Sequence, residues 1–547
     1  GQEGKLWCLL TRNGKRTGTA MVKIAMDLLA EGEIDEKTAL EGCEPNKLDE
    51  LLHPIFDKQA LAQAKVLTRG LPASPGAACG QIVFFADDAK EWHEAGRQVV
   101  MVRIETSPED LAGMSAAEGI LTARGGMTSH AAVVARGMGK CCVSGAGAIN
   151  VDYKTRTVEI DGVVLKEGDY ISIDGSTGEV DFGQVKTKPA EVSGDFAKLM
   201  DLCNKYTKLV VRTNADTPHD AEVARGFGAV GIGLCRTEHM FFEADKIKAM
   251  REMILSENQE GRKKALAKLL PFQQKDFYGI LKAMDGHPVN IRLLDPPLHE
   301  FVPHDLAGQQ AMADEMGVSV QKIQQRVNSL SEANPMLGHR GCRLGNTYPE
   351  ITEMQTRAIL GAAIQLKKEG FDPHPEIMVP LIGIVNEFDL QEKVIRDTAK
   401  ELFAQEGIEI PFKVGTMIEI PRAALTADYI AKKAEYFSFG TNDLTQMTFG
   451  YSRDDIASFL PVYLEKKILN VDPFQVLDQN GVGQLVKMAV EKGRSTRPDL
   501  KCGICGEHGG EPSSVKFCHR VGLNYVSCSP FRVPIARLAA AQAAVEE

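Results

Sequence analysis

Most of the chain alternates short hydrophobic runs with stretches in which apolar residues recur every three or four positions. The runs are mostly continuous, which is typical of parallel strands buried on both faces, and the stretches between them have helical periodicity. The expected strands are Leu209–Ala215, Val230–Cys235, Val289–Leu294, Glu376–Pro380, Lys413–Glu419, Tyr436–Gly440, Lys501–Cys505 and Asn524–Cys528. Eight such strands predict an α/β fold with a (β/α)8 TIM barrel over 195–547, whose main insertion falls at about 295–374.

The residues that precede this barrel have shorter β runs. The expected strands are Gln81–Phe85, Val99–Ile104, Gly119–Leu121, Thr157–Ile160 and Tyr170–Ile173. A helix is expected from Ser129 to Arg136, ended by Gly137. The pattern predicts a compact β/α domain over 67–186.

Two stretches rich in proline and glycine, Thr68–Gly76 and about 183–194, divide the chain into three parts. Flexible connectors are predicted near Leu71–Gly76 and Gly183–Gly194. The part before them, 1–66, shows a short strand at Leu6–Leu10 and a helix at Ala20–Leu29, too little for a complete domain. We expect it to be the end of an upstream domain plus a helical linker. The chain does not begin with Met, so we expect it to start inside a longer protein.

Polar residues that can take part in catalysis or binding lie where several barrel strands end. Barrel enzymes carry their active sites on this face. These residues are Arg236, Glu238, Arg292, Asp295, Glu419, Asn442, Asp443 and Cys505. Paired guanidinium groups suit a carboxylate or a phosphate, and carboxylates beside an amide suit Mg²⁺. The alternative is that the arginines only pair with the neighbouring carboxylates, and the spacing leaves both readings open.

The smaller domain carries the motif Gly125-Gly-Met-Thr-Ser-His130. Two glycines allow a tight turn, Thr128 or Ser129 can cap a helix, and His130 then falls in its first turn. The helix N-terminus favours an anion and disfavours the imidazolium, which leaves a neutral nucleophilic nitrogen. The motif therefore fits a phosphohistidine, while a histidine that only packs under a glycine turn is the open alternative.

Composition narrows the class of protein. The net charge is −11, which disfavours a nucleic-acid binder, and no apolar run is long enough to span a membrane. Twelve cysteines scattered along the chain suit a reducing compartment, so we expect a cytoplasmic protein. The motif Cys502-x-x-Cys505-x-x-His508 can also be read as a zinc or redox site, but no second ligand cluster accompanies it.

Several longer segments resemble the pyruvate, phosphate dikinases, which are phosphoenolpyruvate-utilising (PEP-utilising) enzymes. They are Gly125–Gly145, Gly231–Phe242, Ile291–Phe301, Gly415–Pro421, Phe439–Arg453 and Cys505–Ser513. The resemblance covers essentially the whole chain and implies a swivelling phosphohistidine domain followed by a TIM barrel that binds phosphoenolpyruvate or pyruvate. It implies the reversible reaction of ATP, phosphate and pyruvate to AMP, pyrophosphate and phosphoenolpyruvate, with Mg²⁺ and in a homodimer.

Carried over position by position, the resemblance makes His130 the phosphoryl carrier and Cys505 the acid/base at the methylene carbon. The implied substrate-binding residues are Arg236, Arg292, Arg340, Glu419, Thr441, Asn442 and Asp443, with Glu419 and Asp443 as Mg²⁺ ligands. Arg12 would belong to a nucleotide pocket. Thr128 matches a regulatory phosphorylation site of plant relatives, although a helix cap is the simpler reading.

The resemblance also has limits. Family members carry an ATP-grasp domain before these parts, and only its last strand is expected here, so the ATP half-reaction should need the missing domain. Leu10 stands where the family usually has Gln. Phosphoenolpyruvate synthase typically has Cys where this chain has Ser129, and the first enzyme of the sugar phosphotransferase system has no ATP-grasp remnant. A non-catalytic phosphoryl carrier or regulator is the remaining alternative.

Overall fold

The computed structural model describes residues 10, 14–107, 110–127, 129–190, 192, 194–242 and 244–547. Arg12, Thr128 and all of the expected strand Leu6–Leu10 except its last residue lie outside this part of the chain. The chain forms two compact units, which divide between Leu199 and Met200.

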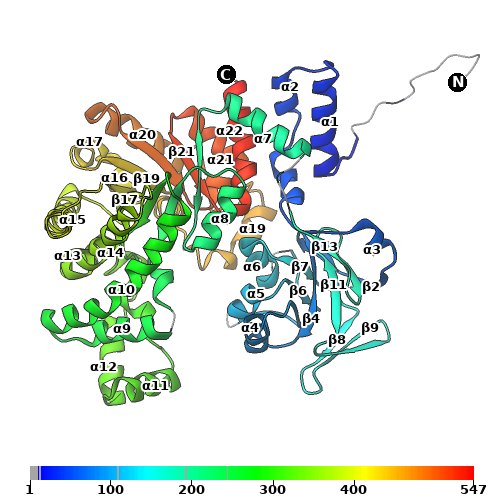
Figure 1. The fold of residues 1–547 in the computed structure, drawn as a ribbon, viewed down its shortest axis with the longest axis horizontal. Helices are drawn as coiled ribbons and strands as arrows, with labels where there is room; N and C mark the ends of the chain where they lie inside the picture. Colours follow the sequence, from blue (N-terminus) through cyan, green and yellow to red (C-terminus); the bar gives the residue numbers. More distant parts are fainter. Residues whose placement is uncertain are drawn as a thin grey trace, which may run out of the picture. The chain divides into compact units, whose positions relative to one another are not determined.

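The first unit is built on a mixed eight-stranded sheet with the strand order β2-β12-β11-β4-β5-β6-β7-β3 (Figure 1). Its strands are β2 (Lys65–Arg69), β3 (Leu71–Ser74), β4 (Ala77–Val83), β5 (Val99–Arg103), β6 (Gly119–Thr122), β7 (Cys141–Ser144), β11 (Tyr170–Asp174) and β12 (Glu179–Phe182). Strands β4 to β7 are parallel, and the others pair antiparallel. The smaller sheets are formed by β8 (Ile149–Asp152), β9 (Thr157–Ile160) and β10 (Val163–Lys166), and by β1 (Ile55–Phe56) with β13 (Thr187–Lys188).

The large sheet is buried on both faces, as the run Val99-Val-Met-Val102 in β5 requires. Val99 and Met101 pack in the cluster that contains residues of α4, α5 and α6, whereas Val100 and Val102 pack with residues of β8 and β9. The helices of this unit are α1 (Gly18–Ala30), α2 (Glu36–Glu41), α3 (Lys58–Ala62), α4 (Ala86–Glu94), α5 (Leu111–Ala116) and α6 (His130–Met138), and α7 (Gly194–Tyr206) crosses the division. This burial fixes β5 and α6, the two elements that position His130.

The connector predicted at Leu71–Gly76 is wrong for most of its length. Thr68 belongs to β2, and Leu71–Ser74 forms β3, which pairs with β7. Both strands lie at the edges of the sheet, where a proline that lacks an N–H is tolerated. Pro72 therefore lies within an edge strand and does not interrupt it.

The second unit contains a closed barrel of eight parallel strands, β14 to β21 in chain order, and the predicted barrel is confirmed. Its strands are β14 (Val210–Asn214), β15 (Ile232–Arg236), β16 (Pro288–Arg292), β17 (His374–Val379), β18 (Lys413–Ile418), β19 (Tyr436–Gly440), β20 (Lys501–Cys505) and β21 (Tyr525–Cys528). Inside it pack Leu234, Met378, Met417, Tyr436 and Cys505. Every predicted strand overlaps an observed one because the apolar runs face both the barrel interior and the outer helices.

Helices surround the barrel and extend it on one side (Figure 1). They are α8 (Pro218–Gly226), α9 (Ala244–Leu255), α10 (Gln259–Ala283), α11 (Leu306–Met316), α12 (Val320–Leu330), α13 (Gly341–Thr347), α14 (Pro349–Lys368), α15 (Val385–Glu406), α16 (Pro421–Leu425), α17 (Ala427–Ile430), α18 (Thr441–Phe449), α19 (Leu460–Glu465), α20 (Val482–Thr496), α21 (Pro512–Arg520) and α22 (Val533–Val545). The predicted insertion between the third and fourth strands holds α11 to α14. Among the described residues, no helix is both long and apolar enough to cross a membrane.

Candidate functional site

His130 is the first residue of α6 in the first unit. Ser129 caps the helix, because its Oγ accepts a hydrogen bond from the backbone N–H of Ala132 at 3.4 Å. The preceding turn needs Gly125, whose φ of +108° is a conformation that other residues rarely adopt. The helix continues to Met138 and ends at the left-handed Gly139, so the predicted end at Gly137 is wrong by two residues.

The imidazole of His130 is oriented by a threonine that no motif in the sequence indicates. Oγ1 of Thr106, just after β5, lies 2.8 Å from Nδ1 of His130, and Thr106 is buried. When Nδ1–H donates this bond, the lone pair is on Nε2. Nε2 is then the ring nitrogen at which a new bond can form.

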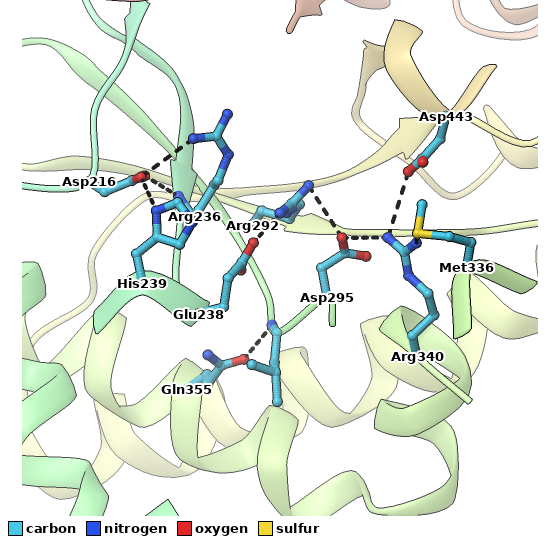
Figure 2. A network of polar contacts seen from close by, with 11 residues as sticks. Asp216, Arg236, Glu238, His239, Arg292, Asp295, Met336, Arg340, Gln355 and Asp443 are labelled. Atoms are coloured by element: carbon cyan, nitrogen blue, oxygen red, sulfur yellow. Dashed lines mark hydrogen bonds and ion pairs between the residues drawn. The ribbon is translucent and has the colours of Figure 1, made fainter. Parts of the chain in front are cut away.

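Three arginines and four carboxylates form a network at the C-terminal ends of the barrel strands, which we call the barrel mouth (Figure 2). Arg292 ends β16, and its Nη2 donates to Glu238, while its Nη1 lies 3.5 Å from Asp295. Burial alone would lower the pKa of Arg292, but Glu238, Asp295 and Glu419 outweigh it and raise that pKa. Arg292 is therefore a fixed positive charge.

Asp295 joins Arg292 to Arg340, which comes from the insertion (Figure 2). Nη2 of Arg340 donates to Oδ2 of Asp295 at 2.6 Å and lies 3.6 Å from Oδ2 of Asp443. Arg340 is buried, and although burial opposes its charge, Asp295, Asp443 and Glu419 raise its pKa. The strand-end rule alone does not find Arg340, because it precedes α13 rather than following a strand.

Arg236 occupies a more open position at the barrel mouth. Its side chain is 34% exposed, and Nη1 lies 3.6 Å from Oδ2 of Asp216. The same carboxylate accepts from the backbone N–H of Arg236 at 2.7 Å and lies 2.8 Å from Nδ1 of His239. Burial would raise the pKa of Asp216, yet these contacts hold that pKa below its ordinary value. Asp216 follows β14 and was not predicted.

Glu419 lies buried at the barrel mouth. It is 1% exposed, and its Oε1 accepts from the backbone N–H of Leu381 at 2.6 Å. Burial, followed by the nearby carboxylates of Asp443 and Asp295, raises the pKa of Glu419 well above its ordinary value. Bringing Glu419 and Asp443 together thus costs free energy that a bound cation would offset.

These two carboxylates fit Mg²⁺ better than a metal held by protein ligands alone. Mg²⁺ typically takes one or two carboxylates and completes its shell with water and substrate oxygens. Within the described residues, no group of three or more His, Cys, Asp or Glu side chains could hold a metal ion. The buried Oδ1 of Asn442, without a hydrogen-bond partner in this part of the chain, is a further oxygen beside Asp443.

Cys505 ends β20 and points into the barrel. Its thiol is 2% exposed, with Oγ of Ser438 and the carbonyl of Phe439 at 3.6 and 3.7 Å from Sγ. Burial raises the pKa of Cys505, while the hydroxyl of Ser438 and the charge of Arg292 oppose that rise. The thiol is protonated at neutral pH, which suits a proton donor.

Thr441 and His508 brace the loop beside this thiol. Oγ1 of Thr441 lies 2.6 Å from Nδ1 of His508 and donates to the carbonyl of Cys505 at 3.4 Å. Nε2 of His508 lies 2.8 Å from the carbonyl oxygen of Pro473. Because both ring nitrogens are engaged and Cys502 contacts the carbonyl of Leu500, the Cys-x-x-Cys-x-x-His motif is not arranged as a zinc site.

The second unit therefore brings most of the predicted site residues together. Arg236, Arg292, Glu419, Thr441, Asn442, Asp443 and Cys505 lie at strand ends or directly after them, and Arg340 joins them from the insertion. The arginines do pair with carboxylates, as the simpler alternative has it. However, Nε of Arg292, Nε of Arg340 and Oδ1 of Asp295 are buried without hydrogen-bond partners in the described part of the chain. A polar ligand would satisfy them.

Comparison with known proteins gives two family matches. Residues 190–545 match the PEP-binding domain of PEP-utilising enzymes, and residues 96–178 match their mobile domain. The chain is 59% identical over 545 residues to a pyruvate, phosphate dikinase of Clostridium symbiosum, and 59% over 546 residues to chloroplastic pyruvate, phosphate dikinase 1 of Arabidopsis thaliana.

These alignments include 100% of this chain but 62% and 57% of the two relatives, so the chain spans less than two thirds of their length. A solved citrate lyase structure from Burkholderia xenovorans LB400 aligns with a TM-score of 0.28 and 14% identity, over 50% of this chain and 64% of that one. That likeness is too weak to support an argument.

Proposed function

This chain belongs to the PEP-utilising enzymes, and we propose that it performs reversible phosphoryl transfer between phosphoenolpyruvate and His130, the pyruvate half of a pyruvate, phosphate dikinase reaction. The observation that carries the proposal is the barrel mouth, where buried guanidinium groups, two adjacent carboxylates and a thiol converge. A small substrate that carries both a carboxylate and a phosphate matches this set of groups.

Arg292 and Arg340 bind the substrate phosphate and carboxylate in place of their present acidic partners, and Arg236 closes the site from its exposed side. The amide of Asn442 and the hydroxyl of Thr441 complete the polar wall. Glu419 and Asp443 hold Mg²⁺, which supplies charge stabilisation at the phosphoryl and enolate oxygens when it is bound.

In the forward half-reaction, Nε2 of His130 forms a bond to phosphorus as the bond between phosphorus and the enol oxygen breaks. The electron pair of the broken bond stays on the enolate of pyruvate. The thiol of Cys505 then gives its proton to the methylene carbon and becomes a thiolate, which makes pyruvate. In reverse the thiolate removes that proton, and the enolate oxygen attacks phospho-His130.

His130 must approach the substrate for this transfer, so we infer that the first unit swivels as a carrier. We further propose the complete dikinase reaction with ATP and phosphate, a homodimeric assembly and a cytoplasmic location. These properties follow from the relatives' family rather than from the two described units.

Labelling tests the half-reaction directly. The chain is incubated with ³²P-phosphoenolpyruvate and Mg²⁺, beside the variants His130→Asn and Cys505→Ala. We expect acid-labile label on wild type and none on His130→Asn. Cys505→Ala should still be labelled, because the proton moves after the phosphoryl group. Unlabelled wild type, or a labelled His130→Asn variant, would contradict the proposal.

A further inference from the structure

A polar cavity lies in the second unit, and its lining shares no residue with the barrel mouth. It has a volume of about 310 Å³ and lies between the segment that joins α9 to α10, the helix α12, and Tyr348 at the junction of α13 and α14. Three basic side chains line it: Arg262, Lys322 and Arg326. In Figure 1, α9, α11 and α12 gather at one end of the unit.

The charges around this cavity do not cancel. Nε of Arg262 donates to the buried Glu350 at 2.5 Å, and its guanidinium lies 4.4 Å from the centre of the Tyr348 ring. Lys322 pairs with Glu257 at 3.1 Å, but both side chains are exposed, so that pair contributes little. An anionic ligand can therefore replace Glu257 at Lys322 with a small loss of free energy.

Arg326 has no acidic partner in the described part of the chain. Its Nε donates to the carbonyl of Ile254 at 2.8 Å and its Nη1 to Oγ of Ser329 at 3.4 Å. These contacts fix the guanidinium and leave N–H groups of its fork for a ligand. The 25-residue helix α10 also begins beside the cavity, at Gln259, and its N-terminus adds positive potential.

We propose that this cavity binds a small phosphorylated molecule, whose phosphate lies against Arg326 and Lys322. The volume is at the low end for ligand sites and fits a phosphate with a few attached atoms. The ring of Tyr348 offers an apolar surface for those atoms.

The helix α13 links a residue of the cavity wall to a residue of the barrel mouth. Tyr348 and Arg340 stand at the two ends of α13, and the ring of Tyr348 contacts that of His339, with ring centres 5.8 Å apart. A ligand that contacts Tyr348 thus acts on the residue next to Arg340. We infer that occupancy of the cavity changes the affinity of the barrel mouth for phosphoenolpyruvate; this second step rests on the proposed function, whereas binding does not.

Calorimetric titration with inorganic phosphate tests binding, using the intact chain, Arg326→Gln and the control Lys263→Gln. Lys263 is an exposed base on α10 that does not line the cavity. We expect Arg326→Gln to weaken one phosphate-binding event at least about tenfold and Lys263→Gln to leave it unchanged, because a charge-assisted contact is lost only in the former. Lys322→Gln, at an exposed position, is a second variant with an expected weakening of about threefold.

Phosphate binding at the barrel mouth does not depend on Arg326, so identical isotherms for wild type, Arg326→Gln and Lys322→Gln would overturn the site. The coupling is read from the phosphoenolpyruvate concentration that gives half-maximal labelling of His130. We expect phosphate to change it at least about twofold more in wild type than in Arg326→Gln. Equal changes in wild type and Arg326→Gln would overturn the coupling but not the binding site. Absence of any labelling would count against the proposed function, and the titration would still test whether the cavity binds phosphate.

Discussion

The two places proposed to handle the same phosphoryl group are built very differently. His130 stands at the start of a helix, half-buried, and Thr106 is the side chain that orients its ring. The barrel mouth instead buries arginines and carboxylates in one connected network. A carrier must release the group that it accepts, whereas a site that stabilises an enolate needs charges fixed before the substrate arrives.

Because of this difference, substitutions in the two regions should impair different steps of the reaction. Damage at the barrel mouth should remove proton chemistry and substrate binding, while damage near His130 should slow phosphoryl transfer and leave the barrel intact. Each variant below alters one of the two regions.

The largest effect is expected for Cys505→Ala. Exchange of the pyruvate methyl protons with D₂O in the presence of Mg²⁺ should fall about 10³-fold, because the acid/base is lost, and NMR measures this exchange. Exchange needs the thiolate, and burial raises the pKa of Cys505, so the wild-type rate should increase as the pH rises from neutral to alkaline values. Cys502→Ala, equally buried on β20, is the matched control and should keep the exchange. Equal losses in the two variants would contradict the assignment.

Arg292→Met should reduce the rate of His130 labelling about 10²-fold to 10³-fold, measured by rapid quench at low phosphoenolpyruvate concentration. The reason is the loss of a fixed guanidinium that faces developing charge. The substitution also leaves Glu238 buried without its partner and should destabilise the unit. The double variant Arg292→Met/Glu238→Gln separates these effects: it should recover stability but not labelling. Recovery of both would make Arg292 a structural residue.

Some parts of the fold and of the site could be predicted from the pattern of apolar residues, and others could not. The barrel strands were predictable because burial on both faces requires continuous apolar runs, such as Ile377–Val379 in β17. Residues at strand ends, including Arg292 and Glu419, followed from the barrel itself. Arg340 came only from the family resemblance, because nothing in the pattern of the insertion shows that it returns to the barrel mouth.

Other features left no signal in the sequence. Thr106 lies 24 positions before His130, and only the pairing of β5 within the sheet brings the two together. Asp216 looks like any polar residue after a strand until its contact with Arg236 is visible. Conversely, Pro72 gave a clear signal for a connector, yet an edge strand tolerates it.

Thr106→Val tests the carrier side of the comparison. Without the hydroxyl, the ring of His130 is free to rotate and to change tautomer, so labelling should slow about tenfold. Thr106→Ser should restore the rate because it keeps the hydroxyl. Methyl-proton exchange of pyruvate should stay at the wild-type rate in both variants. If exchange also fell, the two regions would not be separable, and Thr106 would have a general structural role.

The smallest effect is expected for Asp216→Asn, at the open edge of the barrel mouth. The side-chain amide oxygen can still accept a hydrogen bond from the backbone N–H of Arg236, but the negative charge that attracts the partly exposed Arg236 side chain is lost. Half-maximal labelling should therefore need about threefold more phosphoenolpyruvate. The pKa of Asp216 is below its ordinary value of 3.8, so its carboxylate stabilises the fold above that pH and loses this contribution as the pH falls further. Urea unfolding should therefore show wild type more stable than the variant by about 1 kcal/mol at pH 7, with the difference shrinking below pH 4. A difference that stays constant with pH would mean that the charge of Asp216 does not act through Arg236 and His239.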